Sequence, residues 1–277
     1  MNSETDSEIV RYAAREAELR RAPVHLLHVV DPATPAPGQG GTGQVQEIAA
    51  AVLAPHAALI RTEFPQLDVM VEPVLGRPSA ELTDRSGGYS LIVLGHRRRG
   101  RFPRPPLSSV ARQVATRADC PVMVIRALPA DEHGPVAVGF ALPDGSRAAL
   151  RFAACEAGLR GESLEIVHAD HRPQPLTLGR APPGQVDQSG IVRAGRRVLE
   201  GEAALPHPRH PGLRTAVRIE HGYPVPVLLD TTRHAALLVI GSHHRTPLPR
   251  VLLGSLTGEV LRRASCPVAV VPTAGTA

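Results

Sequence analysis

Short apolar runs alternate with amphipathic segments along this chain. In the second half, the runs at 135–140, 163–169, 214–222, 236–241 and 266–272 are rich in Val, Ile, Leu and Ala. Between them, the segments 144–160, 186–203, 224–234 and 255–264 have helical spacing, with Asp144 or Ser146 near the start of the first. This alternation predicts an α/β fold with a parallel sheet covered by helices on both faces.

The chain also repeats itself. Residues 89–126 match 235–272 at an offset of 146 positions, and residues 9–30 match 149–170 at an offset of 140. The repeat predicts two homologous domains, 1–128 and 134–273, joined near "RALPADEHGP". Proline- and glycine-rich segments at 31–43 and 170–185 follow the second strand of each copy and are interpreted as mobile loops.

The first copy has no counterpart of the strand at 135–140, because the offset of 140 places Met1 opposite Ala141. If that strand is central, its two neighbours lose their ladder partners, against the rule that buried backbone groups are paired. Two explanations remain open: translation begins upstream, which we favour, or another arrangement closes the gap.

Several motifs of the chain point to a known family: "VAVGF" followed by "DGSRAALRFA" in the second half, then "LLHVVD" and "IVHA", "LLVIGS…GS" before a helix, and "CPVAVV" at the domain end. In these motifs the chain resembles the tandem form of the universal stress protein family. The resemblance implies two Rossmann-like domains of the adenine nucleotide alpha hydrolase-like type, with strand order 3-2-1-4-5. It also implies a site at the carboxyl ends of the strands, where some members bind ATP.

That resemblance implies a set of cofactor-binding positions. ATP-binding members carry glycine, two residues, glycine, nine residues, glycine, and then serine or threonine. An aspartate ending the first strand and a residue late in the second strand hold the adenosine. The matching positions here are Gly241, Gly254, Ser255 and Ala169 in the second domain, and Gly95, Ser109 and Val29 in the first.

The motif is degenerate in both domains. His244 replaces the middle glycine in the second domain, Arg98 and Ser108 replace two glycines in the first, and Ala141 stands where the aspartate belongs. A side chain at the middle position crowds the backbone approach that glycine permits. A cationic side chain could instead bind phosphate by charge. We favour loss of the site, so ATP is the candidate cofactor but its binding is expected to be weak or absent.

The charge pattern narrows the function further. All 31 basic residues are arginine and the net charge is +5, so lysine-dependent chemistry is excluded. The arginine-rich segment 97–104 is interpreted as a solvated loop, with a phosphate-binding rim as the alternative. Nucleic-acid binding is not expected, because no zinc-finger spacing or aromatic RNA-binding signature accompanies the arginines.

No catalytic or metal-binding constellation is found. His243 and His244 are adjacent, but no carboxylate or cysteine completes a set of metal ligands with them. His28 and His168, in matching positions, are expected to be packed or hydrogen-bonded core residues, with a role beside the ligand crevice as the alternative. Cys120 and Cys266 are expected to be small buried thiols. The chain is therefore not expected to be an enzyme.

The remaining expectations concern location and partners. No apolar run is long enough to span a membrane and the N-terminus does not resemble a signal peptide, so a cytoplasmic protein is expected. The last strands, 120–125 and 266–271, are predicted to pair as an intramolecular pseudo-dimer with Val122, Val124, Val268 and Val270 at the seam. The predicted function is a non-catalytic role in stress response through interaction with other proteins. The alternative is an ATP-binding, nucleotide-dependent signalling module.

Overall fold

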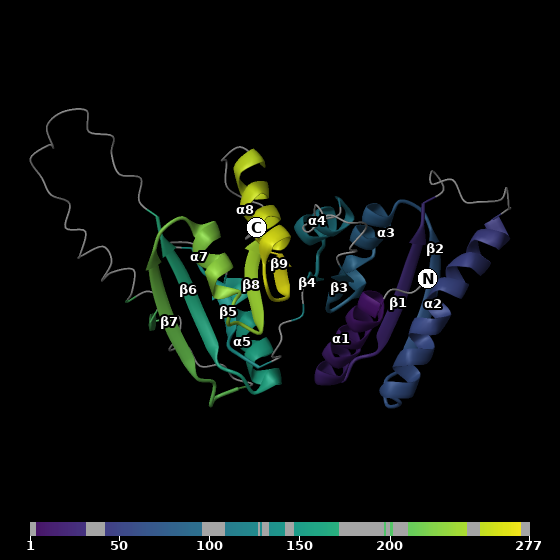
Figure 1. The fold of residues 1–277 in the computed structure, drawn as a ribbon, viewed down its shortest axis with the longest axis horizontal. Coiled ribbons are helices and arrows are strands. Elements are labelled where there is room, and N and C mark those ends of the chain that lie inside the picture. Colours follow the sequence, from purple (N-terminus) through teal and green to yellow (C-terminus); the bar gives the residue numbers. More distant parts are fainter. Residues whose placement is uncertain are drawn as a thin grey trace, which may run out of the picture. The chain divides into compact units, whose positions relative to one another are not determined.

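The chain forms two compact units, unit 1 at Met1–Arg126 and unit 2 at Ala127–Ala277 (Figure 1). The computed structural model describes residues 4–31, 42–95, 109–126, 128, 133–141, 147–171, 197, 200–201, 210–242 and 250–272. The predicted helix at 186–203 and the predicted loops at 31–43 and 170–185 lie mostly outside these residues, as do Asp144 and Ser146.

Unit 2 contains a complete five-stranded parallel sheet. Its strands are β5 (Val136–Gly139), β6 (Leu164–Asp170), β7 (Thr215–His221), β8 (Leu237–Ser242) and β9 (Val268–Pro272). The spatial order is β7-β6-β5-β8-β9, with every neighbouring pair parallel. This is the predicted order 3-2-1-4-5, which is therefore confirmed for unit 2.

The central strand β5 organises the core of unit 2. Val136, Ala137 and Val138 are completely buried between β6 and β8. Helix α5 (Arg147–Arg160) packs on β5, β8 and β9 through a face of alanines, whose small side chains let the helix approach the sheet closely. Helices α7 (Pro224–Thr231) and α8 (Arg250–Arg263) pack on each other, and α7 also contacts β6. The apolar run at 135–140 is therefore the centre of the unit.

Unit 1 contains four described strands in two separate parallel pairs. Strand β1 (Val24–Val30) pairs with β2 (Val69–Leu75), and β3 (Ile92–Gly95) pairs with β4 (Val122–Ile125). No strand lies between β1 and β3 within the part of unit 1 that the structure describes. The predicted lack of a central strand in the first domain is thus confirmed for those residues.

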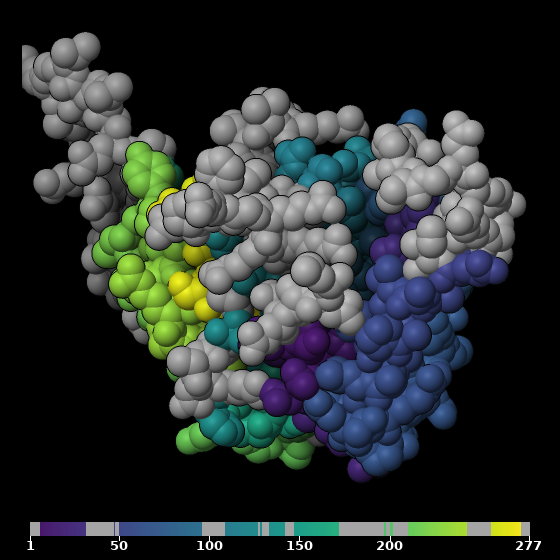
Figure 2. Space-filling view, turned by 45° about the vertical axis from the view of Figure 1, so that its right-hand side comes forward, coloured from purple at the N-terminus to yellow at the C-terminus, as the bar shows by residue number. Residues whose placement is uncertain are grey.

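Helices supply much of the packing in unit 1. They are α1 (Glu4–Arg20), α2 (Thr42–Glu63), α3 (Pro78–Asp84) and α4 (Ser109–Arg117), with a short 3-10 turn at Ser86–Gly88. Helix α1 contacts both β1 and β3, and a Cβ added at Gly95 would lie only 2.4 Å from Cδ1 of Ile9. A second cluster joins α1, α2 and β1 around Ala14, Val24 and Ile60. Residues of α2 form much of the visible surface of unit 1 in Figure 2.

One predicted boundary is wrong. The helix expected over 255–264 begins five residues earlier, at Arg250. The glycine and serine that were expected at its start therefore lie inside the helix, a difference that affects the candidate site.

Candidate functional site

The carboxyl ends of β5 and β6 are tied together by two hydrogen bonds. The backbone N–H of Phe140 donates to the carbonyl of Val167 at 2.9 Å. Nδ1 of His168 lies 2.9 Å from the carbonyl oxygen of Phe140. Because a carbonyl only accepts, Nδ1 carries the proton, and Nε2 is left as an acceptor in the neutral ring. His168 is thus hydrogen-bonded, as expected, and it holds the turn that leads from β5 to Ala141.

Two predicted site residues of unit 2, and the position where the motif aspartate is replaced, lie at this edge of the sheet. Ala141 directly follows the end of β5 and is exposed, and Ala169 and Gly241 are half-buried near the ends of the neighbouring strands β6 and β8. Since β6 and β8 flank β5, the three positions lie at the ends of three adjacent strands. This is where an open parallel sheet forms its ligand crevice.

The corresponding positions of unit 1 are divided between two strand pairs. Val29 is near the end of β1 and Gly95 ends β3, and both are half-buried. No described strand between them carries a counterpart of Ala141. The sequence match therefore survives in unit 1 without the sheet that would bring the two positions together.

The residues expected to contact a phosphate lie at the start of a helix in unit 1 but inside a helix in unit 2. Ser109 is the first residue of α4, whereas Gly254 and Ser255 follow the first four residues of α8. The free N–H groups of a helix belong to its first four residues. The N–H of Ser255 is therefore in the body of its helix and is not available to an anion. His244, Arg98 and Ser108 lie outside the described residues.

A polar cluster on β1 and β2 was not predicted from the sequence. Nε2 of His25 lies 3.1 Å from a carboxylate oxygen of Glu72, and the Tyr89 hydroxyl lies 2.9 Å from Nδ1 of the same ring. Arg85 contacts the other Glu72 oxygen at 2.6 Å. Burial raises the pKa of Tyr89, and the Glu72 carboxylate raises it further.

Unit 2 carries the same cluster with exchanged charges. At the positions of His25 and Glu72 it has Glu165 and Arg218, at the offsets of 140 and 146. Glu165 accepts from Nε2 of His234 at 3.0 Å and lies 3.6 Å from Nε of Arg218. His25 and Glu165 are each the second residue of their strand, whereas Glu72 and Arg218 lie in the middle of theirs, so neither cluster reaches the crevice edge. Both clusters connect strands to residues that follow α3 and α7. In the sequence, such a cluster could be detected as two aligned positions whose charges are both reversed between the repeats.

A buried ion pair recurs in the first helix of each unit. Glu16 and Arg20 pair in α1, and Glu156 and Arg160 pair in α5. Both glutamates are almost completely buried. The sequence signal was present in the aligned segments "REAELR" and "CEAGLR", where glutamate and arginine keep their spacing. The pair is a structural feature, because each glutamate is satisfied by its own helix neighbour.

The buried cysteines are unsuited to nucleophilic chemistry. Burial raises the pKa of the Cys120 thiol to about 11 and that of the Cys266 thiol to about 12. A thiolate is the reactive form of cysteine, so both groups are inert near neutral pH. The expectation that they are small buried thiols is confirmed.

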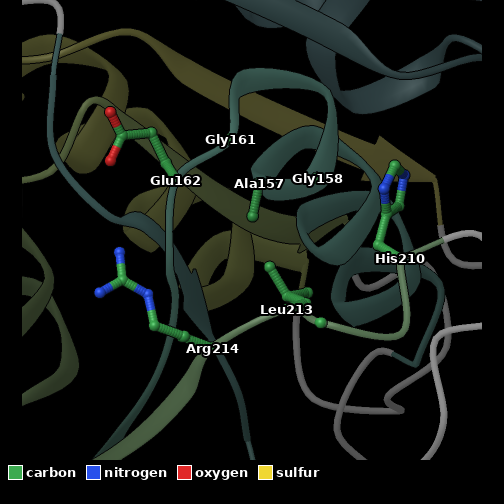
Figure 3. A pocket seen from close by; sticks show the side chains of 8 residues that line it. Ala157, Gly158, Gly161, Glu162, His210, Leu213 and Arg214 are labelled. Atoms are coloured by element: carbon green, nitrogen blue, oxygen red, sulfur yellow. The ribbon is translucent and has the colours of Figure 1, made fainter.

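A shallow pocket of about 230 Å³ lies at the opposite edge of unit 2. It is formed where α5 turns into β6 and where the chain enters β7, and Figure 3 shows Glu162 and Arg214 on one side with His210 on the other. A Cβ at Gly158 would lie 2.2 Å from the His210 ring, so glycine is required for this contact. None of the predicted cofactor-binding residues lines this pocket.

The described residues form neither a metal-binding group nor a membrane-spanning helix. No group of three or more His, Cys, Asp or Glu side chains is placed to hold a metal ion in the described ranges. No helix among the same residues has both the length and the apolar character needed to cross a bilayer.

Comparison with known sequences identifies relatives of the whole chain. The sequence model of the Universal stress protein family matches twice, at residues 1–126 and 133–272. A universal stress protein of Mycobacterium tuberculosis (strain ATCC 25618 / H37Rv) is 31% identical over 273 residues, covering 94% of this chain and 90% of the relative. One of Mycolicibacterium smegmatis is 29% identical over 290 residues, covering 98% and 94%.

Comparison with solved structures supports the fold. A universal stress protein from Archaeoglobus fulgidus DSM 4304 matches with a TM-score of 0.74 at 22% identity, covering 98% of this chain and 95% of that one. A functionally unknown protein from Pseudomonas aeruginosa PAO1 matches with a TM-score of 0.67 at 17% identity, covering 99% and 90%. At these identities the likeness shows the architecture alone.

Proposed function

The chain belongs to the universal stress protein family, and from that premise we propose a non-catalytic role in stress response, exerted through binding in the cytoplasm. Its nucleotide sites are degenerate, with weak or absent affinity for ATP. The observation that carries the proposal is Ala141, which is exposed at the end of the central strand of unit 2. A methyl group there cannot accept a hydrogen bond from a ribose hydroxyl.

The phosphate side of the same edge supports the proposal. The N–H of Ser255 lies in the body of α8, so the helix start does not present it to an anion. His244 replaces the glycine that would let the loop backbone approach a phosphate. Both changes remove contacts that make triphosphate binding strong.

Isothermal titration calorimetry with ATP tests the proposal. We expect a dissociation constant on the order of 0.1 mM or poorer, which corresponds to about 5 kcal/mol. The double variant Ala141→Asp with His244→Gly is expected to bind at least about tenfold more tightly, because it restores a carboxylate acceptor and the backbone approach. The matched control is Arg98→Gly with Ser108→Gly in unit 1, which is expected to change little. Micromolar affinity in the unmodified protein would contradict the proposal.

The alternative is a functional ATP-dependent signalling module. It is favoured by the positions of Ala169 and Gly241, which lie at the same sheet edge and can contact a ligand through backbone groups. Mass spectrometry of small molecules released from the purified protein separates the two functions. A stoichiometric adenine nucleotide would favour the alternative.

The pairing of strands 120–125 and 266–271 as a pseudo-dimer also remains a proposal. Replacing Val124 and Val270 together with lysine is expected to loosen the two halves and to promote aggregation. Size-exclusion chromatography measures this as a shift to larger species. Unchanged elution of the folded double variant would argue against the seam.

A further inference from the structure

Two exposed aromatic rings lie at the carboxyl ends of β6 and β7. His171 directly follows β6, and Tyr223 is the residue that precedes α7. Their ring centroids are 4.0 Å apart with an angle of 31° between the planes. Tyr223 is nevertheless 66% exposed, more than any other large hydrophobic side chain in the described ranges. Because one face lies against His171, much of this exposure belongs to the opposite face of the ring.

The fold itself does not account for an exposed tyrosine here. The chain has only three tyrosines and no tryptophan. The other two tyrosines serve the interior: Tyr12 is buried, and the hydroxyl of Tyr89 is hydrogen-bonded to His25. An aromatic face left open to solvent is a feature that proteins use to stack planar rings.

The backbone around the two rings is held in place. The N–H of Gly222 donates to the carbonyl of Asp170 at 3.3 Å, and this bond joins the end of β7 to the end of β6. The Asp170 carboxylate, which is mostly buried, lies 3.4 Å from Nδ1 of His221. Tyr223 and His171 are thus carried by strand ends that are tied to each other.

The position of the rings relates them to the candidate site. His171 is two residues beyond Ala169, on the edge where open parallel sheets bind their ligands. The matching positions in unit 1 are Asp31 and Arg77, at the offsets of 140 and 146. Neither offers an aromatic face, so this surface is a property of unit 2.

We propose that Tyr223, backed by His171, is a stacking platform for the purine ring of a nucleoside or nucleotide bound by unit 2. The inference rests on the proposed function, because it takes the phosphate contacts to be weak. Affinity then comes mainly from the base. Adenosine, AMP and ATP should consequently bind with similar strength, whereas ribose 5-phosphate should not bind.

The absence of tryptophan gives a direct test. Tyr223→Trp introduces a single tryptophan next to the proposed ligand, and its fluorescence can be excited selectively during titration with each compound. We expect saturable quenching by adenosine, AMP and ATP, with dissociation constants within about threefold of one another, and no response to ribose 5-phosphate. Arg77→Trp is the matched control in unit 1 and is expected to show no saturable change.

Calorimetry with the smaller variant Tyr223→Ala provides a second measurement. Adenosine binding is expected to weaken by about fivefold or more, as for the loss of one base–aromatic stack. Three results would overturn the inference: no fluorescence change in Tyr223→Trp with any of the compounds, a response to ATP but not to adenosine, or unchanged adenosine affinity in Tyr223→Ala. Failure of the proposed function is a different result, namely micromolar ATP affinity in the unmodified protein.

Discussion

The two units descend from one repeat and differ at the centre of the sheet. In unit 2, β6 has β5 on one side and β7 on the other, and Ile166 and Val167 are almost completely buried. In unit 1, the matching strand β1 has β2 as its only described strand partner, and Leu26 and Leu27 are half-buried. The same sequence position therefore contributes less to the core in unit 1, whose described residues include no central strand.

Local features are retained in both units. Ser86 and Thr232, at matching positions, each accept a hydrogen bond from a backbone N–H before the last strand, from Asp119 at 2.8 Å and from Ser265 at 3.1 Å. The Glu–Arg pair of the first helix is also retained. Local contacts of this kind are therefore present in both units. Deep burial of the strand that matches β6 is found only in unit 2, where a central strand is described.

The largest change in this difference is expected when unit 1, whose described residues contain no central strand, is supplied with one. We expect that fusing the sequence of residues 134–141, through a short glycine-serine linker, before residue 1 will stabilise unit 1 by about 4 kcal/mol, because buried valines and new ladder bonds outweigh the ordering entropy. Hydrogen exchange measured by mass spectrometry should show roughly a thousandfold slower exchange in β1 and β3. The control fusion carries aspartate in place of both valines. Equal exchange with the two fusions would mean that the edges of β1 and β3 do not accept a strand.

Each unit contains its own buried glutamate–arginine pair, and breaking either pair should have the second-largest effect on stability. Glu156→Ala leaves the Arg160 guanidinium without its carboxylate at a largely buried site and is expected to cost about 3 kcal/mol of unfolding free energy. Glu16→Ala is expected to do the same in unit 1. Urea unfolding followed by hydrogen exchange in each unit measures both. The control is Glu63→Ala, whose pair with Arg11 is exposed, and its midpoint should be nearly unchanged. A cost confined to one unit would show that the repeated pair has different roles.

Two alanine substitutions at matching positions of β1 and β6 test whether the strand in unit 1 is less important to stability. Val167→Ala in β6 is expected to cost about 2 kcal/mol, because the side chain is 1% exposed. Leu27→Ala, at the same position of β1, removes a larger side chain but is expected to cost less, since that residue is only partly buried. The free energy of unfolding of each unit is the measurement. A larger cost at Leu27 would refute the assignment of weaker burial to unit 1.

The smallest expected difference between the units is in the rate at which their buried cysteines, Cys120 and Cys266, are alkylated when each unit opens. Burial holds the pKa of Cys120 at about 11 and that of Cys266 at about 12, so both groups are almost entirely thiol at pH 8 in the folded protein. Alkylation therefore requires opening of the unit. We expect iodoacetamide to modify Cys120 a few times faster than Cys266, as judged by peptide mass spectrometry. In denaturant the alkylation rates of Cys120 and Cys266 should become equal. Faster alkylation of Cys266 in the folded protein would contradict the expectation that unit 1 opens more readily than unit 2.

The periodic features of the fold could be predicted from the sequence. Runs such as 135–140 and 236–241 are apolar on both faces, which specifies buried parallel strands. Their order was implied by the resemblance to the universal stress protein family. The lack of a central strand among the described residues of unit 1 could be predicted from the repeat, whose offset of 140 places Met1 opposite Ala141. These properties depend on residue type and spacing along the chain, so one sequence is sufficient to detect them.

The candidate site was only partly predictable. Ala169, Gly241 and Ala141 follow from motif positions, and the structure places them on adjacent strands. The start of α8 was misplaced because "RVLL" contains no capping residue to mark it. The stack of His171 on Tyr223 joins residues from different strands and carries no local pattern.

Residue type and spacing were enough to predict most strands and helices of unit 2, the internal repeat, and the motif residues that are replaced. The contacts of His25 with Glu72 and of Glu165 with His234, and the deeper burial of β6 than of β1, are visible only in the folded chain. The physical reason is that propensity and periodicity act between near neighbours in the chain. Burial and ion pairing depend on distances in space, which are set when the strands of each unit come together.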